Sequence, residues 1–144
     1  MSNLFLWHGI FLQFSWCLMG LAQFGVNRYC KKYWWLHMWA HRIIGTLMTL
    51  FTYIFGILAI KSMGKVSVGF HEIVGCIYLA FTGMLLLGGV ATRSILRRST
   101  WNTPFALRFK MMHRTFGYLL LFLGQVQIQV GGHDYGTNPK HITD

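Results

Sequence analysis

Four long apolar runs dominate the chain and limit what it can fold into. Short basic clusters separate these runs, which cover Leu4–Val26, Trp35–Ile60, Val66–Ala91 and Met111–Gly131. A run of about 20 apolar residues is long enough to cross the hydrocarbon core of a bilayer as a helix. Only 11% of the 144 residues are charged, far fewer than a soluble domain of this length exposes. The sequence therefore predicts an all-α, multi-pass integral membrane protein. We expect a four-helix up-down bundle at 1–131 and a polar tail at 132–144.

The basic residues are distributed unequally between the two ends of this predicted bundle. Ten of the thirteen fall on one face, which we call the basic face: Arg28, Lys31, Lys32, Arg42, Arg93, Arg97, Arg98, Arg108, Lys110 and Arg114. The opposite face, which we call the terminal face, has Lys61, Lys65 and Lys140. By the positive-inside rule the basic face is cytosolic, or faces the matrix in a mitochondrion.

This distribution also predicts where the ends of the chain and its partners lie. Both termini are expected on the non-cytosolic or intermembrane-space side. The membrane is then the mitochondrial inner membrane, an endomembrane or the plasma membrane. Because topology accounts for the net charge of +10, we expect a lipid environment and no nucleic-acid partner.

A histidine stands near the start of every predicted helix. His8 opens the first helix and His71 the third, both at the terminal face. His37 and His41 open the second helix and His113 the fourth, all at the basic face. Ionisable side chains inside a membrane span are costly, so their presence indicates a function. The histidines match in depth, first helix with third and second with fourth, and this predicts two binding sites.

Two imidazoles at one depth indicate haem rather than zinc or copper. Zinc and copper sites usually take three or four ligands, often including a carboxylate or a thiolate. Glu72 is the one acid near these depths, and no cysteine matches them. Two histidines held across a bundle suit the axial positions of a b-type haem, which leaves the iron no open position and favours electron transfer. Glycines beside the histidines would admit the macrocycle or permit close helix packing: Gly9, Gly45, Gly75 and Gly117.

The order and spacing of these motifs resemble the cytochrome b561 family. The similarity is closest to the four-helix membrane module that elsewhere follows a DOMON domain, and extends to ferric reductase-like membrane modules. The stretches that carry it are "WHGIFLQFSWCLMG" from Trp7, "NRYCKKYWWLH" from Asn27, "HEIVG" from His71 and "HRTFGYLLLFLG" from His113.

The resemblance implies two b haems with specific ligands. It assigns His8 with His71 to one haem and His37 with His113 to the other. His41 stands where relatives often carry glutamine. Because it begins the same His-x-x-x-Gly pattern as His71 and lies one turn from His37, His41 remains an alternative ligand.

The function implied by the resemblance is transmembrane electron transfer through two bis-histidine haems stacked across the membrane. With each iron about one turn inside a core of about 30 Å, the irons lie roughly 20 Å apart. The family implies a small-molecule electron donor such as ascorbate, and a quinol is the other candidate. Whether the chain is itself an enzyme stays open; the class that fits is a transmembrane oxidoreductase of the ascorbate- or quinol-dependent type.

A structural role is the alternative prediction. The chain would then be an accessory or structural subunit of a larger membrane complex, for example a mitochondrial respiratory one, with or without haem. Other protein subunits or a second copy of the chain are the expected partners. Gln125, Gln127 and Gln129 in the last predicted helix favour hydrogen bonds between helices or to another subunit.

Overall fold

The computed structural model describes residues 2–62, 69–96 and 103–137, and these residues form helices without any strand. The all-α prediction is therefore confirmed. The elements in order are α1 (Ser2–Gln13), a π-helix (Phe14–Met19), α2 (Gly20–Tyr29), a 3-10 turn (Cys30–Lys32), α3 (Trp34–Ser62), α4 (Phe70–Leu96) and α5 (Pro104–Thr137). Since α1, the π-helix and α2 follow one another without a break, they form one rod, and the bundle has four rods.

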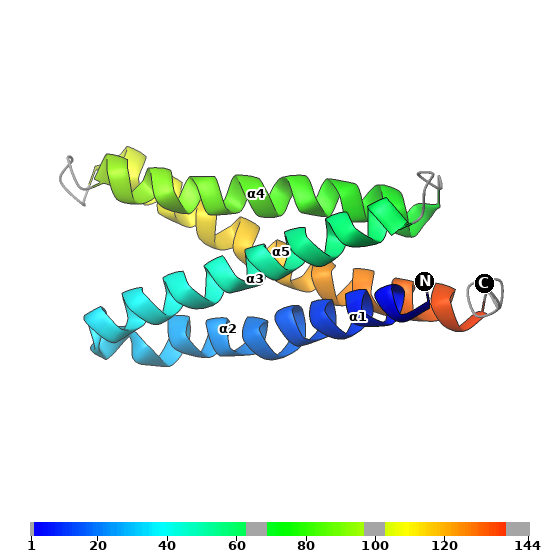
Figure 1. Ribbon diagram of the computed structural model, residues 1–144. Helices are drawn as coiled ribbons and strands as arrows, with labels where there is room; N and C mark the ends of the chain where they lie inside the picture. Colours follow the sequence, from blue (N-terminus) through cyan, green and yellow to red (C-terminus); the bar gives the residue numbers. More distant parts are fainter. Residues whose placement is uncertain (1, 63–68, 97–102, 138–144) are drawn as a thin grey trace.

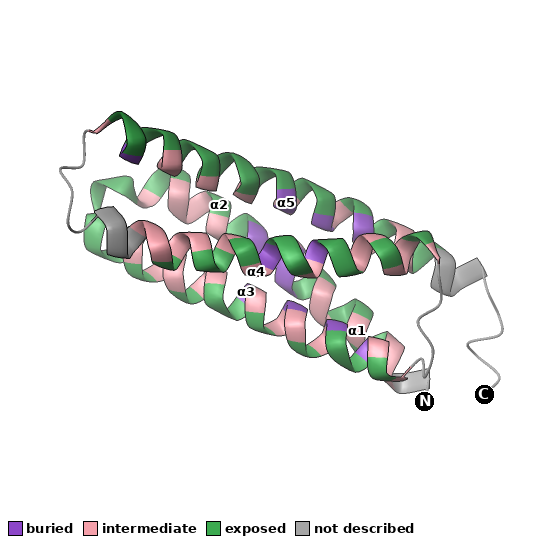
Figure 2. Ribbon diagram, turned by 90° about the horizontal axis from the view of Figure 1, so that it is seen from above, coloured by how far each residue is buried: buried purple, intermediate pink, exposed green. Residues whose placement is uncertain are grey.

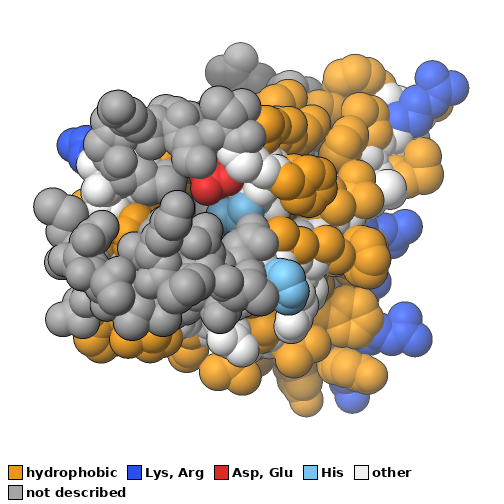
Figure 3. Space-filling view, turned by 90° about the vertical axis from the view of Figure 1, so that its right-hand side faces the viewer, with side chains coloured by type: hydrophobic (Ala, Val, Ile, Leu, Met, Phe, Trp, Pro, Cys, Tyr) orange, Lys and Arg blue, Asp and Glu red, His pale blue; other side chains and the backbone are white. Residues whose placement is uncertain are grey.

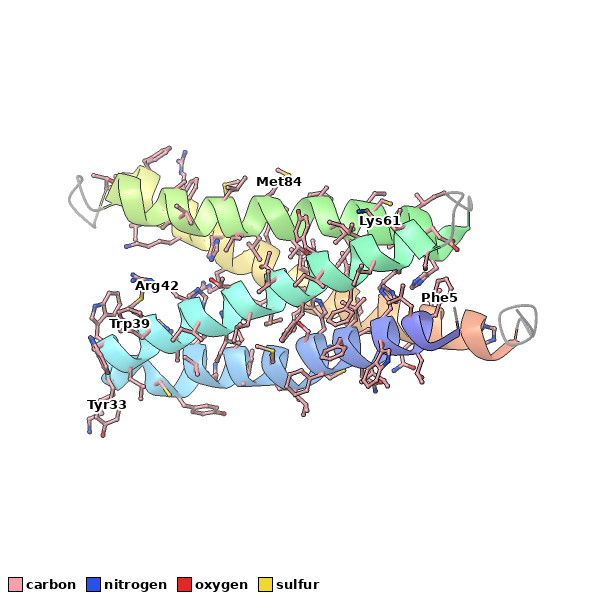
Figure 4. All side chains as sticks on the ribbon, viewed as in Figure 1. Phe5, Tyr33, Trp39, Arg42, Lys61 and Met84 are labelled. Carbon is pink, nitrogen blue, oxygen red and sulfur yellow. The ribbon has the colours of Figure 1, made fainter. Side chains whose placement is uncertain are left out.

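The four rods run in alternating directions. Figure 1 shows that α1 begins and α5 ends at the same end of the bundle, as an up-down order requires. Along the chain, α3 packs against α1 and α2, and α4 packs against both α3 and α5. Figure 4 places Tyr33, Trp39 and Arg42 at the end where α3 begins, and Phe5 and Lys61 at the opposite end. The two ends thus correspond to the predicted basic and terminal faces.

Three of the rods are long and apolar enough to cross a membrane: Leu4–Lys32, Trp34–Ser62 and Phe70–Thr92. This supports the prediction of a multi-pass membrane protein. The fourth rod, α5, has 34 residues but does not reach the same apolar content. Its predicted span, Met111–Gly131, is interrupted by an arginine and by three glutamines near its end. Four spans were predicted, and α5 is less apolar than the other three because it carries these polar side chains, of which Gln125 and Gln127 bond to neighbouring rods.

Helix α5 is also longer than the sequence suggested. The fourth apolar run begins at Met111, but the helix begins seven residues earlier, at Pro104. Proline is favoured there because its missing N–H would have no helical partner in any case. The Thr103 hydroxyl caps the start by accepting the Ala106 N–H at 3.3 Å. At the other end α5 continues to Thr137, beyond the predicted tail boundary at 131.

The first rod contains a π-helix, which changes how its backbone is bonded. A π-helix frees backbone carbonyls from the usual pattern and needs outside donors. Here the Gln125 Nε2–H donates to the Trp16 carbonyl at 2.8 Å, and the Cys17 thiol donates to Gln125 Oε1 at 3.0 Å. Gln125 therefore joins α5 to the π-helix, as expected of an interhelical glutamine.

The buried core lies in the middle of the bundle. It consists of Trp16, Met48, Tyr78 and Leu120, and Figure 2 shows buried residues gathered there while the outer surfaces are exposed. The rings of Trp16 and Tyr78 meet edge to face at 4.9 Å. Trp16 Nε1–H donates to Thr52 Oγ1 at 2.9 Å, and the Tyr78 hydroxyl donates to the Leu120 carbonyl at 2.9 Å. These bonds satisfy the polar atoms that the aromatic side chains bring into an apolar interior.

Several residues of the sequence argument lie outside the described part of the chain. These are Lys65, Arg97, Arg98 and Lys140. The histidines of both predicted sites are all described.

Candidate functional site

One histidine pair lies near the terminal face of the bundle. His8 comes from α1 and His71 from α4, and their ring centroids are 6.3 Å apart with 86° between the planes. Both side chains are half-buried. Figure 3 looks onto this end and shows histidine side chains beside hydrophobic ones. The structure thus brings together the two residues that the sequence paired at this depth.

A second histidine pair lies toward the basic face. His41 of α3 and His113 of α5 have ring centroids 6.2 Å apart and planes at 77°. His37 stacks on His41 at 6.2 Å and 14°, and its Nε2–H donates to Asn27 Oδ1 at 3.1 Å. The partner beside His113 is therefore His41, whereas the family resemblance assigned His37.

The early start of α5 explains this difference in level. Because the helix begins at Pro104 rather than at Met111, His113 lies nine residues inside it. His41 lies seven residues inside α3, and His37 only three. At 1.5 Å per residue, His113 is closer in depth to His41 than to His37.

Three of these four histidines use Nδ1 for a contact with a neighbouring helix. His8 Nδ1–H donates to the Phe55 carbonyl at 3.0 Å. His71 Nδ1 accepts the Gln127 Nε2–H at 3.0 Å, and His41 Nδ1 accepts the Gln23 Nε2–H. Histidines that bind a metal usually donate the N–H of the second ring nitrogen to an acceptor, and of these three only His8 does so, toward the Phe55 carbonyl.

The Nδ1 atom of His113 is different. It is buried and has no hydrogen-bond partner among the described residues. A buried polar atom without a partner costs free energy. The basic-face pair therefore has one anchored ring, His41, and one whose position depends on packing alone.

The two glutamines occupy equivalent positions at the two ends of the bundle. Gln23 Nε2–H also donates to the His41 carbonyl at 3.1 Å, and Gln127 Nε2–H to the His71 carbonyl at 2.6 Å. Each amide nitrogen lies over the glycine four residues after its histidine. A Cβ on Gly45 would meet Gln23 Nε2 at 3.5 Å, and a Cβ on Gly75 would meet Gln127 Nε2 at 3.4 Å. The close neighbour of these two glycines is a glutamine of another helix, which agrees with close helix packing, one of the two roles that the sequence left open.

Two other glycines make room for the histidine rings. A Cβ on Gly131 would run into the His71 ring, and a Cβ on Gly89 would approach His113 Cε1 at 3.4 Å. Along α4 the spacing from His71 to Gly89 equals the spacing from His113 to Gly131 along α5. Because α4 and α5 run antiparallel, the histidine of each helix packs on the glycine of the other. Gly9 has nothing within 4 Å of a Cβ. The glycines that lie against the histidine rings are thus Gly89 and Gly131, not those that follow the histidines in sequence.

A cavity of about 90 Å³ connects the terminal pair with the core. Its lining includes His8, His71, Gln127, Trp16 and Tyr78. Pockets for cofactors typically measure about 300–1,000 Å³, so side chains around the cavity must move aside before a macrocycle fits. Two imidazoles are the donor set that a bis-histidine haem uses, and the cavity beside them is smaller than a macrocycle.

The described residues contain no group of three or more histidine, cysteine or acidic side chains placed to hold a metal ion. Each level instead offers two imidazoles. That donor set suits axial ligation, where the remaining ligands belong to the cofactor itself.

Sequence reasoning missed Gln23 and did not assign Gln127 to a histidine. Both are polar residues inside or near the end of an apolar run, and this is the signal that would have identified them. Their histidine partners depend on how each helix is rotated about its axis, which the spacing of residues alone does not define.

Comparison of the chain with protein-family models, with curated proteins and with solved structures finds no match.

Proposed function

We propose that this protein transfers electrons across a membrane through two b-type haems, one held by His8 and His71 and the other by His41 and His113. The observation that carries this proposal is the separation of the rings, 6.3 Å in one pair and 6.2 Å in the other. A first-row metal lies about 2 Å from an imidazole nitrogen, which is itself about 1 Å from the ring centre, so two axial imidazoles have centroids about 6 Å apart. The rings of His37 and His41, which lie one turn apart on α3, are also 6.2 Å apart, but only the two proposed pairs join histidines of different rods.

The chain's own residues orient the rings for this role. The Phe55 carbonyl holds His8, and the amides of Gln127 and Gln23 hold His71 and His41. Gly131 lets His71 lie close against α5. Rings anchored in this way keep their geometry when the charge on a bound metal changes, which lowers the reorganisation that electron transfer requires.

The core between the two levels supports transfer from one to the other. When bound, a b haem supplies one-electron redox chemistry. Trp16, Met48, Tyr78 and Leu120 fill the space between the levels and exclude water from it. The edge-to-face contact of Trp16 with Tyr78 gives closely packed atoms across the middle of the bundle. Dense packing shortens the gaps through which an electron must tunnel.

An electron donor at the basic face follows from the charges there. Lys31, Lys32 and Arg108 are exposed, and Arg42 lies beside the His41 level. Cations of this kind attract a small anionic donor such as ascorbate, and an uncharged quinol would not need them. Reduction of the purified protein by ascorbate, and its slowing by added salt, would favour an anionic donor and a transmembrane oxidoreductase.

A role as a subunit of a larger complex is the second candidate, and one observation favours it. Gln129 is exposed on the outside of α5, the least apolar of the four rods. A polar amide facing lipid is costly, and a neighbouring subunit or a second copy of the chain would satisfy it. Native electrophoresis after mild solubilisation tests this, because a complex migrates well above the 16.7 kDa chain. This role is compatible with bound haem.

The decisive test of the proposed function is haem quantification. We expect the purified protein to give a dithionite-reduced minus oxidised spectrum with a sharp b-type α band, and pyridine haemochrome analysis to give about two haems per chain. A folded, helical protein that contains no haem would contradict electron transfer and favour the structural role.

A further inference from the structure

An open groove lies on the outer side of α3, near the basic face. Its lining consists of Trp39, Arg42, Ile43, Thr46 and Leu47, and its volume is about 260 Å³. These residues recur at intervals of three and four along the helix, so they share one side of it. Figure 4 shows Arg42 on the side of α3 away from α2, and no described residue of another rod lines the groove. The groove therefore opens to the surroundings of the bundle.

The depth of Arg42 places its charge at the membrane surface. Helix α3 has 29 residues and is apolar enough to cross a membrane. At 1.5 Å per residue it extends about 43 Å, so a hydrocarbon core of about 30 Å leaves roughly 7 Å of helix outside the core at each end. Arg42 comes eight residues after Trp34, the first residue of α3, and its Cα is then a few ångströms inside the core. The long side chain lets the guanidinium extend from there to the level of the lipid phosphates.

The described residues offer Arg42 no carboxylate. The chain has three acidic residues, Glu72, Asp134 and Asp144. Glu72 is in the first turn of α4 and Asp134 is in the last turn of α5, and both turns lie at the terminal face, at the opposite end of the bundle. Asp144 lies outside the described residues. Because a cation at this depth is costly without an anion beside it, the lipid is the nearest source of one.

The order of chemical groups along the groove matches the order of groups in a phospholipid. The guanidinium of Arg42 can bind a phosphate through two parallel N–H donors. Trp39, one turn nearer the surface, adds an indole N–H, and exposed tryptophan is typical of the headgroup level. Thr46, one turn deeper, carries a hydroxyl that can donate to an ester carbonyl. Ile43 and Leu47 are exposed and give the groove an apolar wall.

We propose that this groove binds an anionic phospholipid of the leaflet at the basic face, with the phosphate on Arg42 and the first part of one acyl chain over Ile43 and Leu47. The anionic class follows from charge, because ten of the thirteen basic residues lie at this face and repel the ammonium group of a choline or ethanolamine lipid. The positive-inside rule places this face on the side where anionic lipids are abundant. Such a site does not require bound haem.

The experiment is a lipid titration of the purified, delipidated protein in mild detergent. Phosphatidylglycerol and phosphatidylcholine with the same acyl chains are added separately, and native mass spectrometry gives the dissociation constant of the first bound lipid. We expect the wild type to bind phosphatidylglycerol about fivefold more tightly, the factor that one cation near an anionic headgroup supplies. Inorganic phosphate at the same ionic strength should not displace the lipid.

Three variants locate the site. Arg42→Gln should abolish the preference for phosphatidylglycerol. Arg28→Gln is the matched control, because Arg28 is an exposed cation near the same face that does not line the groove, and it should keep the preference. Leu47→Trp fills the groove without changing the charge and should weaken the binding of phosphatidylglycerol. Circular dichroism of each variant checks that the helices are retained.

Four results would overturn the proposal. The first is equal affinity of the wild type for the two lipids, and the second is an equal loss of preference in Arg28→Gln and Arg42→Gln. The third is unchanged binding in both Arg42→Gln and Leu47→Trp. The fourth is displacement of the lipid by inorganic phosphate, which would assign Arg42 to a free anion instead.

Discussion

The ring of His113 lies against that of His41, with 6.2 Å between centroids and 77° between planes. The ring of His37 stacks on His41 and does not pair with His113. His41 has a further anchor in Gln23 of α2, and His37 is hydrogen-bonded to Asn27, also of α2. This arrangement is the reason to propose His41 as the axial ligand on α3.

The choice between the two histidines of α3 is testable by substitution. We expect His41→Ala to lower the haem content from about two to about one per chain, because an axial ligand is lost. His37→Ala is the matched control, one turn away on the same helix, and should keep both haems. Pyridine haemochrome analysis of the two variants measures this. The reverse outcome would restore the ligand set that the family resemblance implies.

The glycine beneath His71 gives a second prediction. A methyl group at Gly131 would overlap the His71 ring, and α5 or the ring must then move. We expect Gly131→Ala to lose the terminal-face haem, or to bind it weakly, while the other haem stays. Gly132→Ala is the control, because a Cβ there has nothing within 4 Å. Equal haem content in the two variants would show that His71 does not need this close approach.

The polar contact in the core predicts a stability effect. The Thr52 hydroxyl accepts the Trp16 N–H, so Thr52→Val leaves a buried donor without a partner and should cost about 1–3 kcal/mol. Thr49→Val, three residues earlier, removes a hydroxyl that donates to the Gly45 carbonyl of its own helix and should cost less than about 1 kcal/mol. Thermal unfolding in detergent, compared with the wild type, measures both. A similar cost for the two variants would contradict the role given to the Trp16–Thr52 bond.

The predicted orientation can be tested with the native Cys30. This residue lies at the basic face, beside Lys31 and Lys32, and is partly exposed. By the positive-inside rule we expect a membrane-impermeant maleimide to modify it only from the cytosolic or matrix side. In a Cys30→Ser background, Lys61→Cys should react from the other side, since Lys61 lies at the opposite end of the bundle. Labelling of Cys30 from the outer side of sealed vesicles would reverse the topology.

The fold was largely predictable from the sequence because apolar runs and basic clusters report on helices and their ends. The depth matching of His8 with His71 needed only an up-down order, and the structure places these residues side by side. The π-helix at Phe14–Met19 was not predicted, and one of its carbonyls, that of Trp16, is bonded to the Gln125 side chain of a helix distant in sequence. The start of α5 was predicted too late, at Met111, because the turns before it are not apolar enough to extend the run, and the depth of His113 was therefore wrong as well.

The remaining parts of the site depend on helix rotation, which a single sequence does not define. The hydrogen bonds of Gln23 to His41 and of Gln127 to His71 form only when the rods pack together. Gly89 and Gly131 likewise become contacts of the rings only because α4 and α5 run antiparallel. Spacing within one helix identified Gly45 and Gly75, but the partner that fills the space above each glycine came from another helix.

The most direct measurement of the central claim is electron paramagnetic resonance of the oxidised protein. Iron between two imidazoles is low-spin, and near-perpendicular ring planes produce a strongly anisotropic signal. The angles of 86° and 77° predict two such signals per chain, each absent after loss of its own histidine pair. High-spin iron in the wild type, or a folded protein without any haem iron, would contradict bis-histidine ligation at both levels.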